Sequence, residues 1–409
     1  MNICLVSQFY PPDTGGGGIA AYIYYLAQGL RRRGHTIYVI SKSNGHSAPF
    51  IEQDGIAVYR LKQPDTPYRL TLLPLVGRQW RGFVFFAYSC KVRRLLQTIA
   101  RQVHIDIVEY ADIAAEGFMH PSQHGIPYVV KLHTPHFVLK RFYSQRQMNF
   151  DTRLIEWMEK RFILRANEVI SPSHSLADIV AAEYGLPVER IKIVRNPIDT
   201  DFFKPSECSD SSARDDEPTI LYVGRLEAIK GAHVFAKAIP LIIRAKPETR
   251  FVFLGADRKN AFGRSMQMEL QEYLRDRGVL SHTEFRGHAA PAVFLQYYRQ
   301  ATICVIPSLF ENCPYTLLEA MSCGKPVVAS NAHGMAEIVD HGETGLLFEP
   351  GNAESLANAV ITLLDDPAYR TQLGNRAREK MLKKYALAAV AERTEQVYSR
   401  VWRGTQARV

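Results

Sequence analysis

Hydrophobic residues along the first half of the chain alternate between short continuous runs and longer patterns with helical spacing. The short runs have the length of strands that are buried on both faces. Strands that alternate with helices in this way are typical of a mostly parallel sheet. The predicted strands cover residues 3–6, 37–40, 105–108, 128–132 and 168–170.

The segment between the first two predicted strands is the clearest helix of this half. Its apolar residues recur at helical spacing over residues 19–33, and it ends in Arg31-Arg32-Arg33-Gly34. Cations and a following glycine are typical of a helix C-terminus. The pattern therefore predicts a β-α-β unit at the start of the chain.

The same alternation restarts after a polar segment. Residues 205–218 are small, polar and charged without an apolar period, which indicates an interdomain linker. Five more strands and a final amphipathic helix follow it. We therefore predict two α/β domains, 1–204 and 205–385, and a helical segment over 386–409. The later strands cover residues 219–223, 250–254, 282–285, 303–306 and 326–329.

The length and composition agree with two globular domains. A chain of 409 residues exceeds one ordinary core, and 46% of its residues are hydrophobic. No apolar run approaches the roughly 18 residues of a membrane span, and the first residues lack a cationic signal region. We expect a cytoplasmic protein. Six cysteines without a Cys-x-x-Cys pair are expected to be reduced.

The net charge of +9 lies almost entirely in the first half. Residues 1–200 hold 24 Lys plus Arg against 16 Asp plus Glu, which leaves +8. A basic half can bind anionic lipid, acidic glycan or nucleic acid, and solvated charge without a partner is the commoner explanation. We predict no nucleic-acid partner.

A helix predicted within residues 78–101 offers one membrane contact. Its apolar stripe opposes a basic face, as in helices that lie on anionic membranes. A helix that packs inward on its own domain has the same pattern, so both interpretations stay open. The stripe consists of Val84, Phe85, Tyr88, Val92, Leu95, Leu96 and Ile99, opposite Lys91, Arg93, Arg94 and Arg101.

Candidate ligand-binding residues follow several predicted strands. A run of four glycines, Gly15 to Gly18, opens the first helix and would let the backbone approach a ligand closely. The second strand lacks the acid that binds a ribose, so a nicotinamide dehydrogenase is not predicted. Arg225 and Lys230 could neutralise a diphosphate, and His133 could contact substrate. Surface charge and a structural histidine are the alternatives.

Residues 305–330 carry the most functional information. Glu311 and Glu319 lie eight positions apart, and Pro314 between them suits a first helical turn. The N–H groups of a helix start bind phosphate, while Glu319 could accept hydrogen bonds from a sugar diol and Glu311 could reach the far side of the ligand. This spacing suits a nucleotide sugar. An amphipathic helix without a ligand is the alternative.

Several segments occur in a distinctive order: Pro11-Pro12 with the glycine run, Gly34-His35, His133, Gly224-Arg225 with Lys230-Gly231, and Glu311 to Glu319 followed by Gly324-Lys325-Pro326. Together they resemble family 4 of the retaining glycosyltransferases, nearly from end to end. The resemblance implies a GT-B fold, with two Rossmann-like domains facing a cleft and a C-terminal helix that returns to the N-terminal domain. It also implies metal-independent, retaining transfer of a sugar, expected to be a hexose, from a nucleoside diphosphate sugar to an acceptor hydroxyl, without a cofactor.

The same resemblance implies roles for individual residues. Arg225 and Lys230 would hold the diphosphate, and Glu319 would bind the ribose. Glu311 would bind the donor sugar, and His133 would lie near the reacting centre, so these two are the catalytic candidates. The predicted donor-binding residues are Gly17, Gly18, Arg225, Lys230, His288, Asn312, Cys313, Pro314, Tyr315, Thr316, Leu317 and Glu319.

Two positions depart from the family pattern. Tyr22 stands where many relatives carry a histidine, and His333-Gly334 stands where they often carry two glycines. Acceptor and sugar contacts are therefore less firmly predicted than diphosphate contacts. A nucleotide-sugar 2-epimerase and a non-catalytic nucleotide-sugar binding protein remain alternatives to a transferase, which would build a polysaccharide, a glycolipid or a small glycoside.

Overall fold

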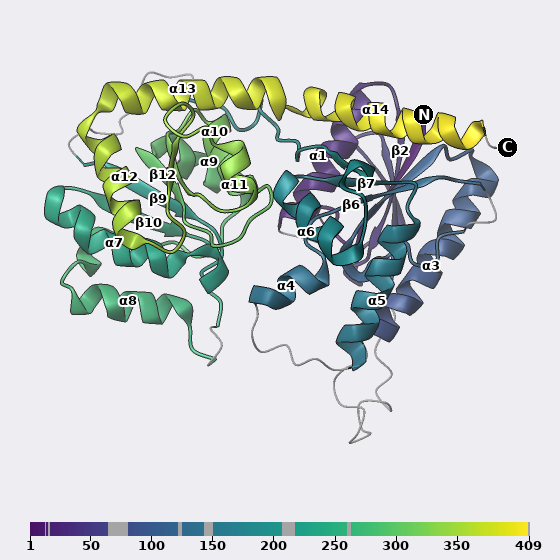
Figure 1. Cartoon of the computed structure of the whole chain (residues 1–409), viewed down its shortest axis with the longest axis horizontal. Coiled ribbons are helices and arrows are strands. Elements are labelled where there is room, and N and C mark those ends of the chain that lie inside the picture. The colour runs from purple at the N-terminus through teal and green to yellow at the C-terminus, as the bar shows by residue number, and fades with distance from the viewer. Residues whose placement is uncertain are drawn as a thin grey trace. The chain divides into compact units, whose positions relative to one another are not determined.

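The computed structural model describes residues 1–12, 14, 17–63, 81–121, 125–142, 150–206, 217–259 and 263–407. The chain forms two compact units (Figure 1). Unit 1 comprises Met1–Pro197 and Leu387–Val409, and unit 2 comprises Ile198–Ala386. Each unit is a parallel-sheet α/β domain, so the predicted fold class is confirmed. Most of the predicted linker and Cys208 lie outside the described residues.

Unit 1 is built on an eight-stranded sheet with the order β3-β4-β2-β1-β5-β6-β7-β8. Its neighbouring strands are parallel except β3 and β4, which pair antiparallel. β5 and β6 are completely buried, which explains their continuous apolar runs. The strands are β1 Asn2–Val6, β2 Thr36–Lys42, β3 Phe50–Gln53, β4 Ile56–Leu61, β5 Ile107–Ala111, β6 Tyr128–Lys131, β7 Glu168–Ser171 and β8 Ile191–Ile193.

Three strands of unit 1 were not predicted. β3 and β4 form a hairpin at one end of the sheet, and their half-buried pattern lacks a continuous apolar run. Asp54 and Gly55 form its turn with φ of 52° and 71°, which suits the Asp-Gly pair of a tight hairpin. β8 has only three residues and ends the sheet on the other side.

Helices cover the sheet of unit 1. The predicted first helix is α1, and the final helix α14 belongs to this unit and lies beside α1 (Figure 1). The contact is close, because a Cβ added at Gly29 would lie 3.0 Å from Cβ of Ala391. The helices are α1 Gly18–Arg32, α3 Arg81–Gln102, α4 His136–Phe142, α5 Phe150–Arg165, α6 His174–Tyr184 and α14 Leu387–Gln406, with short 3₁₀ turns at Ile113–Ala115 and Val188–Arg190.

The apolar stripe predicted on α3 packs mainly into unit 1. Tyr88, Val92, Leu96 and Ile99 are buried in its core. The inward-packing interpretation therefore accounts for most of the stripe, and these side chains are not exposed for a membrane. Residues 78–80 of the proposed contact lie outside the described residues. No helix in the described part of the chain is both long and apolar enough to cross a bilayer.

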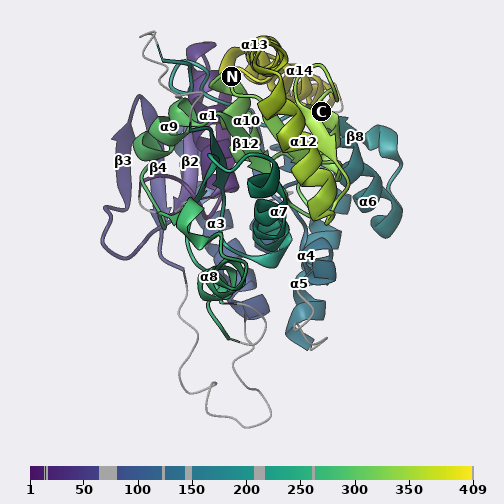
Figure 2. The ribbon, with the colours of Figure 1, turned by 90° about the vertical axis from the view of Figure 1, so that its left-hand side faces the viewer.

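Unit 2 contains a six-stranded parallel sheet with the order β11-β10-β9-β12-β13-β14. α7 and α12 pack against each other on it (Figures 1 and 2). Its strands are β9 Thr219–Val223, β10 Arg250–Leu254, β11 Thr283–Phe285, β12 Ile303–Ile306, β13 Val327–Ser330 and β14 Leu346–Phe348. Its helices are α7 Ala232–Ala245, α8 Met266–Asp276, α9 Pro291–Gln300, α10 Tyr315–Ser322, α11 Gly334–Ile338, α12 Ala353–Asp365 and α13 Pro367–Lys384, with 3₁₀ turns at Ala228–Lys230 and Leu280–His282.

Candidate functional site

The strand order of unit 2 places two predicted binding loops together. β9 and β12 are parallel neighbours, and successive strands continue outward from them in opposite directions. Ligands of open α/β sheets bind beyond the carboxyl ends of strands at such a switch point. The loop after β9 carries Arg225 and Lys230, and the loop after β12 carries Glu311. A hydrogen bond of 2.8 Å from Leu309 N to Ile229 O joins the two loops.

Two glycines allow the backbone of this site to approach closely. Gly231, with φ of 69°, follows Lys230, and a Cβ there would lie 1.8 Å from Pro307 O. A Cβ at Gly334 would lie 1.6 Å from Asn312 O. Gly334 N also donates to Glu311 O at 2.9 Å. Any side chain at either glycine would therefore displace the loop that carries Glu311.

Lys230 and Glu311 form the central contact of the site. Lys230 Nζ donates to Glu311 Oε1, and both side chains are mostly buried. The ion pair orients the carboxylate and compensates its charge. The structure thus brings together two predicted site residues that are 81 positions apart in the chain.

Arg225 is held by a residue that sequence reasoning did not identify. Its Nη2 lies 2.8 Å from Glu227 Oε1, and about half of the arginine side chain is exposed, 48%. Tyr222 OH donates to Arg225 O at 2.8 Å and fixes the main chain. Glu227 lies within the predicted loop, but no local pattern indicates that its carboxylate pairs with Arg225.

α10 begins one residue later than predicted. Pro314 has ψ of 130°, which is extended, so it is the N-cap rather than part of the first turn. Leu317 and Leu318 N–H groups donate to Pro314 O at 3.2 Å. The Leu317 N–H therefore donates within the helix start, and its donor contact stays a prediction. Tyr315 and Thr316 precede it and supply the first-turn N–H groups of the helix start.

Glu319 lies on α10 and has a partner on another helix. Tyr298 OH, on α9, donates to Glu319 Oε2 at 2.8 Å. Burial raises the pKa of Glu319 to about 7, although the hydrogen bond from Tyr298 opposes this shift. Tyr298 was not predicted, because only packing brings α9 to α10. The pair fixes the orientation of the carboxylate proposed to bind ribose.

Three other predicted donor residues are less directly placed. Asn312 and Cys313 are buried in the loop before α10, each 6% exposed. His288 is exposed and follows β11, which lies at the edge of the sheet and two positions from β9. The structure therefore does not bring His288 into the Lys230–Glu311 contact.

In unit 1, His133 follows β6 at the carboxyl edge of the sheet. Its main-chain N donates to Asp112 Oδ2 at 3.0 Å, and its ring meets that of Tyr22 edge-on with centroids 5.0 Å apart. Burial, with a smaller effect of the Lys131 charge, lowers the pKa of His133 to about 3. The imidazole is therefore neutral near pH 7. Gly17 is the N-cap of α1 with φ of 133°, and Gly18 begins the helix; Gly15 and Gly16 lie outside the described residues.

A cluster of buried carboxyl groups supports this edge, and sequence reasoning missed it. Asp112, Glu116 and Glu159 are at most 2% exposed. Each acid accepts a main-chain hydrogen bond. His133 N donates to Asp112, Gln8 N donates to Glu116 Oε1 at 3.0 Å, and His136 N donates to Glu159 Oε2 at 2.8 Å. The three acids therefore hold the loops that follow β1 and β6.

Burial changes the protonation of this cluster. It raises the pKa of Asp112 to about 7 and that of Glu116 to about 8, and the pKa of Glu159 also rises well above its usual value. Glu159 Oε1 also accepts from Ala114 N at 3.1 Å. Ala114 has φ of 60°, a conformation that non-glycine residues rarely adopt. The carboxyl group thus stabilises a strained turn beside the His133 loop.

Tyr22, which departs from the family pattern, serves the core. It is completely buried, and its OH donates to Glu109 Oε1 at 2.9 Å. Tyr398 of α14 donates to the other oxygen at 2.6 Å. Lys131 Nζ lies 4.7 Å from the centroid of the Tyr22 ring. Tyr22 therefore links α1 to the sheet and is not exposed to a ligand.

The other departure, His333, adopts a conformation that suits glycine. Its φ is 48° and its ψ is −130°, immediately before Gly334. The ring packs against Phe310, with centroids 4.4 Å apart. A histidine at this position therefore has a strained backbone, and its packing must offset that strain.

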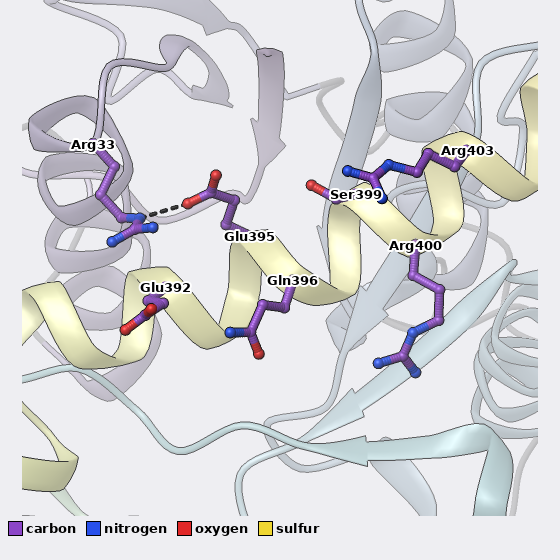
Figure 3. Close-up of a pocket in the computed structure, with 7 residues that line it drawn as sticks. All are labelled: Arg33, Glu392, Glu395, Gln396, Ser399, Arg400 and Arg403. Carbon is purple, nitrogen blue, oxygen red and sulfur yellow. Dashed lines mark hydrogen bonds and ion pairs between the residues drawn. The ribbon is translucent and has the colours of Figure 1, made fainter.

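An open groove in unit 1 lies away from these residues. It runs along α14 and contains an ion pair of 2.5 Å between Arg33 Nε and Glu395 Oε2 (Figure 3). None of the predicted site residues lines it. Among the described residues, no group of three His, Cys, Asp or Glu side chains could hold a metal ion. The groove is lined by Arg33, Glu392, Glu395, Gln396, Ser399, Arg400 and Arg403.

For the sugar transfer that the resemblance implies, His133→Asn is expected to lower kcat by about 10²-fold, as for loss of a positioned polar group. Because the pKa of His133 is about 3, the ring does not titrate between pH 5.5 and 9. Plots of log kcat against pH should therefore have parallel shapes for the variant and the parent. Loss of an inflection near pH 6.5 in the variant would contradict a neutral His133.

Comparison with known proteins agrees with both units. The Glycosyltransferase Family 4 model matches residues 16–202, and the Glycosyl transferases group 1 model matches residues 204–380. An uncharacterised glycosyltransferase of Methanocaldococcus jannaschii is 28% identical over 97% of this chain and 98% of that protein. Sucrose-phosphate synthase from Thermosynechococcus elongatus has a TM-score of 0.80 at 22% identity, over 98% and 99% of the two chains. HepE of Anabaena, solved in complex with UDP and glucose, has a TM-score of 0.72 at 21% identity, over 98% and 100%. The chain belongs to the family 4 glycosyltransferases and has their GT-B fold.

Proposed function

We propose that this enzyme transfers a sugar from a nucleoside diphosphate sugar to an acceptor hydroxyl, with retention at the anomeric carbon and without a metal ion. The Lys230–Glu311 pair at the switch point of unit 2 is the observation that supports this most. The departing group is a diphosphate, whose charge increases as the sugar leaves. Fixed cations and helix N–H groups can stabilise that charge.

Different loops of unit 2 can bind different parts of such a donor. Lys230, Arg225 and the start of α10 offer positive charge and N–H groups to the diphosphate. Glu311 is oriented by its ion pair, so it can accept hydrogen bonds from sugar hydroxyls. Glu319, oriented by Tyr298, can accept them from the ribose. HepE was solved with UDP and glucose, which supports a UDP-sugar as the first donor to test.

His133 contributes a neutral imidazole to the proposed reaction. A neutral ring can donate a hydrogen bond to a sugar hydroxyl without adding charge at the anomeric carbon. Front-face attack, in which the leaving phosphate accepts the proton of the acceptor, and a covalent intermediate on a carboxylate both give retention. We propose that the acceptor hydroxyl belongs to a polysaccharide, a glycolipid or a small glycoside. We propose a cytoplasmic location for this reaction.

Incubation of the pure protein with UDP-, GDP- and ADP-sugars tests the proposal. Slow donor hydrolysis without an acceptor supports a transferase, whereas release of an epimerised sugar supports a 2-epimerase. Binding without turnover supports a non-catalytic protein. The rate should be unchanged in EDTA, and a loss that Mg²⁺ or Mn²⁺ restores would overturn metal independence. The anomeric configuration of the product, read by NMR, tests retention.

At pH 8.5, above the pKa of about 7 of Glu319, Glu319→Gln is expected to weaken donor binding about tenfold, because a charged acceptor of ribose hydrogen bonds is replaced by a neutral one. The effect should be on the KM of the donor, with kcat changed less. Tyr298→Phe is the matched control, since it removes the hydrogen bond to Glu319 but keeps the carboxylate. If Glu319→Gln binds both UDP and ribose 5-phosphate as tightly as the parent does, the ribose assignment is wrong.

A further inference from the structure

Two helices of unit 1, α3 and α5, lie side by side (Figure 1). Their N-terminal ends are joined, because Gly82 N donates to Asp151 Oδ1 at 2.7 Å. A Cβ at Gly82 would lie 2.9 Å from Cδ2 of Leu154, so the helices pack closely there. The outer sides of α3 and α5 therefore form one continuous surface.

Large aromatic side chains are exposed on this surface. Phe83 and Phe86 of α3 are 46% and 39% exposed, and Phe150 and Trp157 of α5 are 73% and 49% exposed. Phe118 connects the two helices, since its ring centroid lies 6.1 Å from that of Phe86 and 5.4 Å from that of Trp157. We call Phe83, Phe86, Phe118, Phe150 and Trp157 the aromatic face. Exposed aromatic residues in such a group usually mark an interaction site.

The charged residues exposed on α3 and α5 are all cations. α3 contains no acidic residue. On α5, Asp151 and Glu159 are buried, and Glu156 is paired with Lys140 at 3.4 Å. The exposed cations are Arg81, Arg94 and Arg101 on α3, and Arg153, Lys160, Arg161 and Arg165 on α5.

Two of these cations lie close to aromatic rings of the same helices. Arg161 Cζ is 5.6 Å from the centroid of the Trp157 ring, and Arg81 Cζ is 5.6 Å from that of Phe85. This combination is typical of protein surfaces at a bilayer boundary, where aromatic rings enter the headgroup region and cations bind anionic lipids.

We propose that the aromatic face docks on an anionic lipid surface. The contact uses Phe83 and Phe86, which are exposed and do not belong to the apolar stripe predicted from the sequence. Tyr88, Val92 and other residues of that stripe are buried in unit 1 and take no part in it. The cations draw the protein to the negative surface, and the aromatic rings insert at the headgroup level. This proposal does not depend on the donor or the reaction proposed above.

Sedimentation with lipid vesicles tests the docking. The full chain should bind vesicles of phosphatidylcholine with 30 mol% phosphatidylglycerol about tenfold or more tightly than vesicles of phosphatidylcholine alone, because each cation near an anionic surface favours binding. Binding should fall at 0.5 M NaCl, since salt screens the charges. Equal binding to both vesicles, or no binding at 0.02 M NaCl, would overturn the proposal.

Two variants separate the aromatic and the charge contributions. Phe83→Ser with Trp157→Ser should lower vesicle affinity about tenfold, and the matched control is Phe50→Ser, which removes an aromatic ring of similar exposure, 50%, on β3. Arg153→Glu with Arg161→Glu should abolish the preference for anionic vesicles, whereas Arg376→Glu with Arg393→Glu should keep it. Thermal unfolding confirms that each variant is folded.

Other occupants of the face give different results. If a second copy covers it, sedimentation velocity will show a concentration-dependent dimer that Phe83→Ser with Trp157→Ser dissociates, and the lipid proposal is then wrong. If the face only binds a hydrophobic acceptor, the variants will change acceptor KM and leave vesicle binding unchanged. Donor hydrolysis without vesicles should be the same in all variants, so failure of docking is distinguishable from failure of the proposed reaction.

Discussion

Lys230→Ala is expected to lower kcat/KM for sugar transfer by about 10²- to 10³-fold, the usual effect of removing one group that stabilises developing charge. The variant loses a cation proposed to neutralise the diphosphate. It also leaves the carboxylate of Glu311, mostly buried beside it, without its ion-pair partner. That uncompensated charge would repel the donor, so the loss should appear in both kcat and donor KM.

A double-mutant cycle tests the contact itself. Because Lys230 and Glu311 touch, the effects of Lys230→Ala and Glu311→Gln should be far from additive, and the double variant should be less impaired than the product of the two single losses. Lys237→Ala, an exposed lysine on α7, is the matched control and should keep full activity. Additive effects, or normal transfer by Lys230→Ala, would show that the pair does not belong to the donor site.

Glu116→Gln is expected to stabilise unit 1 at pH 8, by at most about 5 kcal/mol. Burial raises the pKa of Glu116 from 4.5 to about 8. Between these values the folded state retains a proton that the unfolded state has lost, so the contribution of Glu116 to the free energy of unfolding falls as pH rises. Glutamine keeps an oxygen that can accept from Gln8 N. Because it does not titrate, its contribution to the free energy of unfolding does not change with pH.

The difference between the variant and the parent should therefore grow with pH. Urea unfolding followed by circular dichroism should give nearly equal free energies of unfolding near pH 4.5 and the largest gap at pH 8. Glu392→Gln, an exposed acid on α14, should show no such trend. A constant gap across this pH range would mean that the carboxyl group of Glu116 is not held protonated in the folded protein.

Most of the fold follows from local patterns that the sequence displays. Strands buried on both faces appear as continuous apolar runs, which is why β1, β9 and β12 could be predicted. β5 begins at Ile107, two residues after its predicted start, because Ile105 is buried but precedes the strand pairing. The half-buried hairpin of β3 and β4 lacks such a run and was missed.

The candidate site was predictable where its residues directly follow strands. Lys230, Glu311 and His133 each lie on a loop after a predicted strand, and parallel strands bring such loops to one edge of their sheet. Their partners are distant in the chain. Tyr298 reaches Glu319 from another helix, and Glu159 reaches the His136 main chain from α5, so no local pattern identifies them.

The sequence by itself determined the two α/β domains, the family and the loops that carry the proposed donor contacts, because strand runs, glycines and ordered motifs are local properties of the chain. Only the tertiary structure decided that Lys230 pairs with Glu311, that Tyr22 is a core residue, and that the stripe on α3 packs inward while an aromatic face stays exposed. Those outcomes depend on which helices and strands pack together, and that packing joins side chains far apart in the sequence and buries one side of a helix in preference to another.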